Sequence, residues 1–166
     1  MKNYRVPTLT IAGSDSSGGA GIQADLKTFS AIGTYGMSVI TAITAQNTEG
    51  VFDVEELSSE IIKSQIKAVC EDIPPKAIKI GMVSSPKIIK DIVESLEIYP
   101  CEYVVVDPVM ISKSGYSLLR PEAKENLIKY LIPKAYIVTP NVPEAEEISS
   151  IKIKTVEDMK KAGNII

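Results

Sequence analysis

Short apolar runs alternate with amphipathic helical patterns along most of this 166-residue chain. The runs are rich in β-branched residues, whereas the segments between them repeat apolar residues at helical spacing. This alternation predicts βαβ units with right-handed crossovers, and therefore an α/β fold with a mostly parallel central sheet. We expect strands at 5–12, 37–45, 77–80, 103–106 and 135–138, and helices at 19–32, 58–71, 86–96, 122–131 and 143–148.

Local signals add detail to this pattern. Ser58 or Ser59 is expected to cap the second helix, because a serine hydroxyl accepts from the free N–H groups of a first turn. Thr155 and Asp158 have the spacing of a capping box for one more helix. The run 103–106 is apolar throughout, which is typical of a strand that is covered on both faces.

A glycine-rich segment, 13–21, joins the first strand to the first helix. Glycine allows positive φ values and close approach of the backbone to a ligand. The N-terminus of a helix favours polar or anionic groups, so this turn predicts a small-molecule site. The pattern of a Walker-type nucleotide loop is absent. Gly19, Gly21 and Ala24 imitate the dinucleotide fingerprint, but no acidic residue ends the second strand to hold a ribose.

Composition excludes several classes of partner. The length is that of one domain, and 45% hydrophobic with 23% charged residues indicates a globular chain. The net charge is −3 and no basic block occurs, which argues against nucleic acid and anionic membranes. Cys70 and Cys101 are isolated, so no disulfide framework or zinc site is indicated, and we expect a cytoplasmic protein. The chain has no histidine, so catalysis would rely on carboxylates, lysine, cysteine or backbone groups.

Polar side chains follow most of the predicted strands. In an open parallel sheet, ligands bind beyond the carboxyl ends of the strands, so residues at these positions are expected to converge. Following the strands in chain order, they are Gly13 and Asp15, Gln46 and Asn47, Gly81 and Met82, Asp107 with Pro108 and Val109, and Thr139, Asn141 and Glu144.

Each candidate side chain has a functional and a purely structural interpretation. Asp107 and Glu144 can hold magnesium, largely through water, beside a phosphate. Alternatively, Asp107 starts an Asp-Pro turn and Glu144 favours the first turn of its helix. The amide of Gln46 can read the edge of a heterocycle or satisfy its own loop. Asp25 on the first helix can contact a ligand or lie in solvent. Lys113, in a Ser-Lys-Ser-Gly loop, can bind a phosphate or lie in solvent.

Five segments, in this order, resemble the hydroxymethylpyrimidine and phosphomethylpyrimidine kinases of thiamine biosynthesis, within the ribokinase-like superfamily. The first is the most specific, because it joins the glycine-rich turn to the start of the first helix. Together they span nearly all of the chain. The segments are 10–29, 39–48, 79–82, 107–110 with 112–115, and 139–145.

The resemblance implies a ribokinase-like three-layer fold, of which residues 1–166 would be the N-terminal portion of a single kinase domain. It implies that Gln46 reads the aminopyrimidine edge and Asp25 binds the exocyclic hydroxyl or amino side. Asp107 and Glu144 match the acidic positions near magnesium and the phosphates. The residues matching the pyrimidine pocket are Gly13, Asp25, Gln46, Met82 and Val109.

The implied activity is phosphorylation of 4-amino-5-hydroxymethyl-2-methylpyrimidine, and then of its monophosphate, with ATP and Mg²⁺. A homodimer is also implied. Members of the family carry a Gly-Thr-Gly-Cys or Gly-Thr-Gly-Asp motif in a later portion, so the base and the anion hole are expected beyond Ile166, and this chain alone is expected to be inactive. The alternatives are a pyridoxal kinase, which acts on a similar hydroxymethyl group, and a pyrimidine-binding fragment without catalysis.

Overall fold

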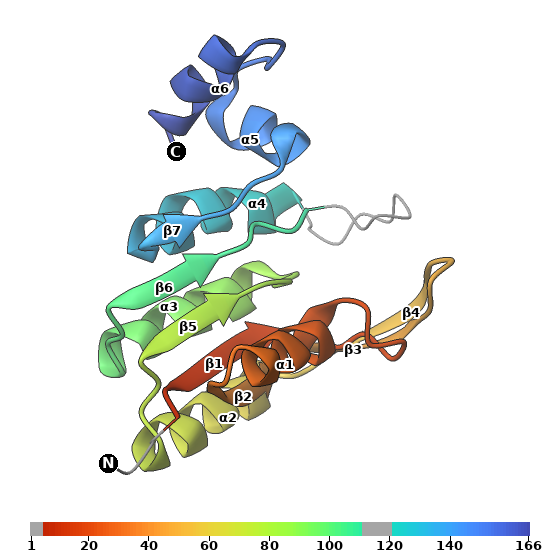
Figure 1. Ribbon diagram of the computed structural model, residues 1–166, viewed down its shortest axis with the longest axis vertical. Helices are drawn as coiled ribbons and strands as arrows, with labels where there is room; N and C mark the ends of the chain where they lie inside the picture. Colours follow the sequence, from red (N-terminus) through yellow and green to blue (C-terminus); the bar gives the residue numbers. More distant parts are fainter. Residues whose placement is uncertain (1–4, 111–120) are drawn as a thin grey trace.

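The computed structural model describes residues 5–110 and 121–166, and its main sheet is parallel (Figure 1). Among these residues, five strands run in the order β2-β1-β5-β6-β7, and every neighbouring pair is parallel. The predicted α/β fold with a parallel central sheet is therefore confirmed. The strands are β1 (Pro7–Ala12), β2 (Tyr35–Ile40), β5 (Ala77–Ile80), β6 (Tyr103–Val106) and β7 (Ile137–Val138).

Helices cover the sheet on both faces, which gives three layers (Figure 1). Helix α1 (Gly21–Ala31) packs on β1 and β2 from one side. The opposite layer is formed by helices that contact one another in sequence order. These are α2 (Ser59–Asp72), α3 (Pro86–Ile98) and α4 (Pro121–Asn126), the last continued by a π-helical turn η1 (Leu127–Leu131) and a 3-10 turn η2 (Ile132–Lys134). Helices α5 (Val142–Ser149) and α6 (Val156–Gly163) pack together beyond β7.

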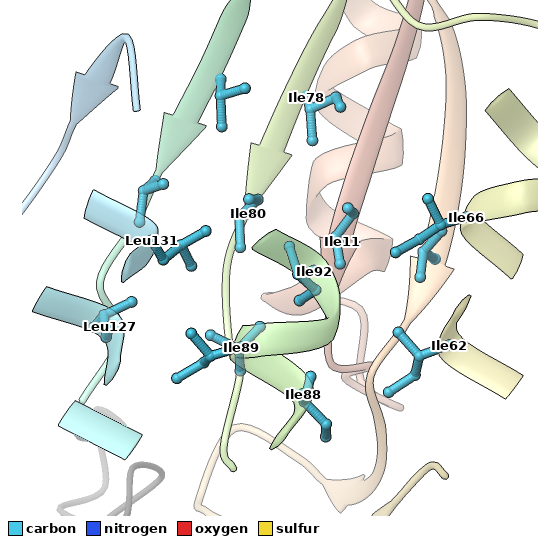
Figure 2. Close-up of a cluster of buried hydrophobic side chains, with 14 of the residues drawn as sticks. Ile11, Ile62, Ile66, Ile78, Ile80, Ile88, Ile89, Ile92, Leu127 and Leu131 are labelled. Atoms are coloured by element: carbon cyan, nitrogen blue, oxygen red, sulfur yellow. The ribbon is translucent and has the colours of Figure 1, made fainter. Parts of the chain in front are cut away.

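The alternation of side chains along β1 explains the two layers. Leu9 and Ile11 are buried in the core, whereas Thr8 and Thr10 point to the opposite face, where Thr10 reaches α1. The core fills the space between the sheet and the helices of the larger layer (Figure 2). Its buried side chains include Ile62 and Ile66 of α2, Ile80 of β5, Ile88, Ile89 and Ile92 of α3, and Leu127 and Leu131 of η1.

The predicted caps of the helices are confirmed. Ser58 caps α2, because its hydroxyl oxygen accepts from the N–H of Ile61 at 3.4 Å. Thr155 and Asp158 form the reciprocal capping box of α6. Of the two serines that the sequence offered for α2, the first is the cap, and the second is the first residue of the helix.

The single strand predicted over 37–45 is wrong. The chain turns sharply at Thr41, so that β2 stays in the main sheet and β3 (Ala42–Gln46) pairs with β4 (Val51–Glu56) in a separate antiparallel hairpin. Thr41 is buried at this corner, with its N–H donating to the carbonyl of Ala12 at 3.0 Å and its hydroxyl to that of Met82 at 2.8 Å. Strand β4 was not predicted, because none of its residues is buried and no apolar alternation marks it.

The expectation that 103–106 is covered on both faces is also wrong. Val104 and Val106 are buried, but Tyr103 on the other face is 43% exposed. Tyr103 packs edge-to-face against the exposed Tyr136, with 5.2 Å between ring centroids. Among the other boundaries, the helix predicted over 122–131 becomes π-helical at Leu127, and the last strand contains only Ile137 and Val138. None of the helices within 5–110 and 121–166 is long and apolar enough to cross a membrane.

A buried carboxylate joins α2 to α3 and gives a first prediction. Asp91 on α3 is buried, accepts a short hydrogen bond from the hydroxyl of Ser59, and lies 2.8 Å from the ammonium of Lys63. Asp91→Ala should lower the free energy of unfolding by about 2–3 kcal/mol, since it leaves the Ser59 hydroxyl buried without its acceptor. Urea denaturation measures this. Glu94→Ala, which removes only an exposed partner of Lys63, should change stability by less than about 0.5 kcal/mol. Equal losses for the two variants would contradict the assignment.

Candidate functional site

The strand order changes direction between the carboxyl ends of β1 and β5. After β1 the chain crosses through α1 on one face to β2, and after β5 it crosses through α3 on the other face to β6. Because the two connections leave in opposite directions, the ends of these neighbouring strands are not covered by a shared loop. This is the topological switch point at which open α/β sheets bind their ligands. Gly13 and Met82, both predicted site residues, lie directly after these two strands.

Close packing at this point depends on glycine. Gly21 has φ +56°, and a Cβ there would lie 2.5 Å from the carbonyl oxygen of Gly13. The N–H of Ile22 in the first turn of α1 donates to that same oxygen at 3.0 Å. A Cβ on Gly13 would lie 3.2 Å from the sulfur of Met82. The structure therefore brings Gly13 and Met82 into contact, and the lack of a side chain at position 13 allows the Met82 sulfur to lie this close to the backbone.

The amide groups of the glycine-rich turn bind a carboxylate of the chain itself. Asp15 is only 2% exposed. Its Oδ1 accepts from the N–H and hydroxyl of Ser17 at 2.9 and 2.8 Å, and its Oδ2 accepts from the N–H groups of Gly19 and Ala20 at 3.0 and 2.8 Å. The N–H groups of Ser17, Gly19 and Ala20 are therefore engaged within the chain itself. Asp15 occupies the anion position of the turn and fixes its shape.

This arrangement predicts a pH-dependent contribution to stability. Burial raises the pKa of Asp15, but its hydrogen bonds from Ser17, Ala20 and Gly19 lower it more, so the pKa lies below 3.8 in the fold. A lowered pKa stabilises the fold above the pKa of the unfolded chain, and the contribution is lost as the pH falls through the folded pKa. Asp15→Asn should therefore cost about 1–3 kcal/mol near neutral pH and less near pH 3.

Urea unfolding at the two pH values tests this prediction. Asp72→Asn, an exposed change at the end of α2, is the matched control and should have little effect at either pH. A loss in Asp15→Asn that is the same at both pH values would show that the charge of Asp15 contributes nothing.

The hairpin β3–β4 is joined to the glycine-rich turn, and this places Gln46. The hydroxyl of Ser16 donates to the carbonyl of Gln46 at 2.7 Å and accepts from its N–H at 2.9 Å. A β-bulge at Ala45 and Gln46 shifts the register there. The side-chain oxygen of Gln46 accepts from Thr44 at 3.4 Å, whereas its amide nitrogen has no partner in the described part of the chain. The loop therefore uses only one end of this amide.

Asp25 and Asp107 lie near each other, on either side of a lysine that the sequence analysis missed. Oδ2 of Asp25 accepts from the hydroxyl of Thr10 at 2.6 Å and lies 3.1 Å from the ammonium of Lys79. That ammonium lies 3.9 Å from Oδ2 of Asp107. The interpretation of Asp25 as a solvated helix residue is wrong, because its side chain is only 17% exposed. The sequence does contain a sign of this lysine's importance. Lys79 is a charged residue within the apolar run 77–80, and it lies on the face opposite Ile78 and Ile80.

Asp107 follows β6 and lies next to the ends of β5 and β7. Its N–H donates to the carbonyl of Ile80 at 2.9 Å, and its side chain is hydrogen-bonded to Thr139. Burial raises the pKa of Asp107, Lys79 opposes this, Asp25 adds to it, and the net shift is upward. Val109 is half-buried in the same turn, with its N–H donating to the carbonyl of Asp107 at 2.8 Å. A carboxylate that is held with a raised pKa at a strand end is a candidate ligand-binding group.

Glu144 is the N3 residue of α5. It is buried, its Oε2 accepts from the N–H of Asn141 at 2.9 Å, and Asn141 caps the N–H of Glu144 in return. The interpretation as a first-turn helix residue is therefore confirmed, and one carboxylate oxygen is engaged. No group of three or more acidic or cysteine side chains within 5–110 and 121–166 forms a metal-binding cluster. Lys113 lies outside the described residues.

Comparison with known proteins shows the family of this chain. A family profile described as phosphomethylpyrimidine kinase matches residues 15–166. The hydroxymethylpyrimidine/phosphomethylpyrimidine kinase of Bacillus subtilis is 52% identical over 155 residues, which cover 93% of this chain and 57% of that protein. The phosphomethylpyrimidine kinase structure from Clostridium difficile is 78% identical with a TM-score of 0.92, covering 96% of this chain and 69% of that one.

A structure of a kinase with a different substrate is also similar. The pyridoxal kinase of Staphylococcus aureus, in complex with pyridoxal, is 44% identical with a TM-score of 0.88, covering 98% of this chain and 59% of that one. The chain spans about half the length of the curated relatives that it matches, 57% for the Bacillus subtilis protein and 51% for the Rhizobium meliloti one.

Proposed function

Because the chain belongs to the phosphomethylpyrimidine kinase family, we propose that the protein phosphorylates 4-amino-5-hydroxymethyl-2-methylpyrimidine, and then its monophosphate, for thiamine biosynthesis. In the first step the γ-phosphoryl group of ATP is transferred to the hydroxymethyl oxygen, and in the second step it is transferred to a phosphate oxygen of the monophosphate. The bond between that group and ADP breaks, a new P–O bond forms, and the hydroxyl proton is released. The observation that carries this proposal is the contact between Gly13 and Met82 at the switch point of a chain with this family match.

We assign the acceptor side of the site to residues around β1, β3 and β5. Gly13 lets the Met82 thioether lie close to the backbone, and this soft apolar group packs well against aromatic rings. The Gln46 amide reads a ring nitrogen together with its neighbouring amino group. Asp25 accepts from the hydroxymethyl or amino group, and Val109 borders the ring. These contacts orient the hydroxyl, and orientation is much of what phosphoryl transfer requires.

We assign the phosphate side to Asp107 and Glu144. Asp107 directly follows β6, and Glu144 lies in the first turn of α5, the helix after β7. Mg²⁺ prefers one or two carboxylates together with water and substrate phosphates. When bound there, Mg²⁺ neutralises charge on the phosphate oxygens. Burial disfavours the ionised form of Asp107, so a cation beside this carboxylate is favoured. Lys113 is a further proposed phosphate contact, from its loop sequence.

Pyridoxal kinase is the second candidate, because the Staphylococcus aureus structure with bound pyridoxal has the same fold at 44% identity. The two activities differ in the ring that the site must recognise. Only the aminopyrimidine offers a ring nitrogen flanked by an amino group, which suits the donor and acceptor of the Gln46 amide. We therefore favour the pyrimidine.

A competition assay with the whole protein that carries these residues tests the proposal. With ATP and Mg²⁺, we expect kcat/KM for the aminopyrimidine to exceed that for pyridoxal by about tenfold or more. Phosphorylated products are separated by chromatography, and ADP release is measured in parallel. A ratio below one would make pyridoxal the substrate, and absence of both products would reject kinase activity on either ring.

A further inference from the structure

We propose that Lys79 is a positioning residue, which holds Asp25 in the orientation that binds the acceptor and holds Asp107 beside it. The proposal rests on the proposed function, since Asp25 and Asp107 are given their roles there. Lys79 lies in β5, on the sheet face that α1 covers, and it was not among the residues that the sequence indicated. Its side chain is 23% exposed, and the charges that it meets come from α1 and from the end of β6.

The ammonium of Lys79 is confined at the carboxyl end of the sheet. A Cβ on Gly81 would lie only 2.7 Å from Nζ, so the lysine side chain extends along its own strand over the backbone of Gly81. From there Nζ lies 3.1 Å from Oδ2 of Asp25 and 3.9 Å from Oδ2 of Asp107. One cation thus separates two carboxylates that would otherwise repel each other in a partly buried place.

The contacts of Asp25 show what this accomplishes. Its Oδ2 is occupied twice, by the Thr10 hydroxyl at 2.6 Å and by the Lys79 ammonium at 3.1 Å. Its Oδ1 has no partner within the residues that the structure describes. Two donors on one oxygen fix the carboxylate and leave the other oxygen available to accept from a ligand. Charge-assisted hydrogen bonds add geometric specificity as well as energy, so Lys79 and Thr10 together fix the orientation of Oδ1.

A double-mutant cycle on the whole protein tests the proposal, with calorimetric titration of 4-amino-5-hydroxymethyl-2-methylpyrimidine as the readout. Lys79→Met should weaken binding by about tenfold, and KM should rise more than kcat falls. In an Asp25→Asn background, the same lysine substitution should cost less than about twofold, because the carboxylate that it positions is gone. Lys79→Arg, which keeps the charge, should recover most of the affinity. Lys76→Met, an exposed lysine before β5, is the matched control and should change nothing.

Two results would overturn the proposal. One is unchanged affinity in Lys79→Met. The other is a loss of affinity that is as large in the Asp25→Asn background as in the wild type, since a structural role for Lys79 would give that result. If Lys79→Met does not fold, Gly81→Ala displaces the ammonium without removing it, and wild-type affinity in that variant would equally reject the idea. Failure of the proposed function looks different, because the wild-type protein would then neither bind nor phosphorylate the aminopyrimidine.

Discussion

Asp107→Asn should lower the turnover number by about 100-fold or more, while the Kd for the aminopyrimidine changes by less than about threefold. The carboxylate lies at the strand end assigned to Mg²⁺ and phosphate, whereas most of the groups assigned to the ring lie around β1, β3 and β5. Asparagine keeps the size and one acceptor oxygen but removes the charge. Steady-state kinetics with ATP and Mg²⁺, together with calorimetric binding, measure the two quantities separately.

The same substitution should not destabilise the protein. The pKa of Asp107 is raised in the fold, chiefly by burial. A group whose pKa is raised on folding favours the folded state most below its unfolded pKa of 3.8, and this contribution is lost as the pH rises through the folded pKa. At neutral pH the ionised carboxylate therefore opposes folding. Its removal should leave the free energy of unfolding unchanged or raise it by less than about 1 kcal/mol, a limit set by solvent screening.

Together, lower turnover and undiminished stability are what a functional carboxylate produces. Asp72→Asn serves as the control and should alter neither quantity. Equal losses in turnover and in pyrimidine affinity would contradict the role of Asp107, because they would indicate a disturbed pocket.

The sequence predicted the sheet well, because burial on the core face repeats along most of its strands. The strand predicted at 77–80 has the bounds that the structure shows. Leu9 and Ile11 lie in the core, as their pattern suggests. Strand β4 was missed for the opposite reason, since a hairpin that buries little has no hydrophobic period to read. The corner at Thr41 depends on hydrogen bonds to Ala12 and Met82, which are distant in sequence.

Site residues were predicted correctly where their position directly after a strand brings them together. They were missed where contacts between distant parts of the chain determine their role. Gly13 and Met82 were found by the strand-end rule, and they do lie together. Asp15 also follows β1, but its carboxylate accepts hydrogen bonds from the glycine-rich turn, and only the fold shows this. Lys79 lies within a strand rather than after it, so the rule passed over it. Its partners come from a helix and from another strand, and no local pattern connects them.

Gln46→Leu should weaken binding of the aminopyrimidine by about tenfold to a hundredfold and leave pyridoxal binding nearly unchanged. Leucine keeps the approximate volume but removes both the donor and the acceptor of the amide. In the structure the Gln46 amide nitrogen has no partner among the described residues, so it is available to a ligand. Pyridoxal has no exocyclic amine beside the matching ring nitrogen, and it therefore has no pair of bonds to lose.

Two further variants separate recognition from general support of the pocket. Gln46→Glu keeps the shape and one acceptor but replaces the donor, so it should lose part of the pyrimidine affinity. Thr48→Val, an exposed change in the same hairpin loop, should bind both ligands as the wild type does. Titration of both rings into all four proteins gives the answer as a ratio of Kd values for the two ligands. If the ratio stays constant because pyridoxal binding falls as much as pyrimidine binding, Gln46 supports the hairpin and does not select the ring.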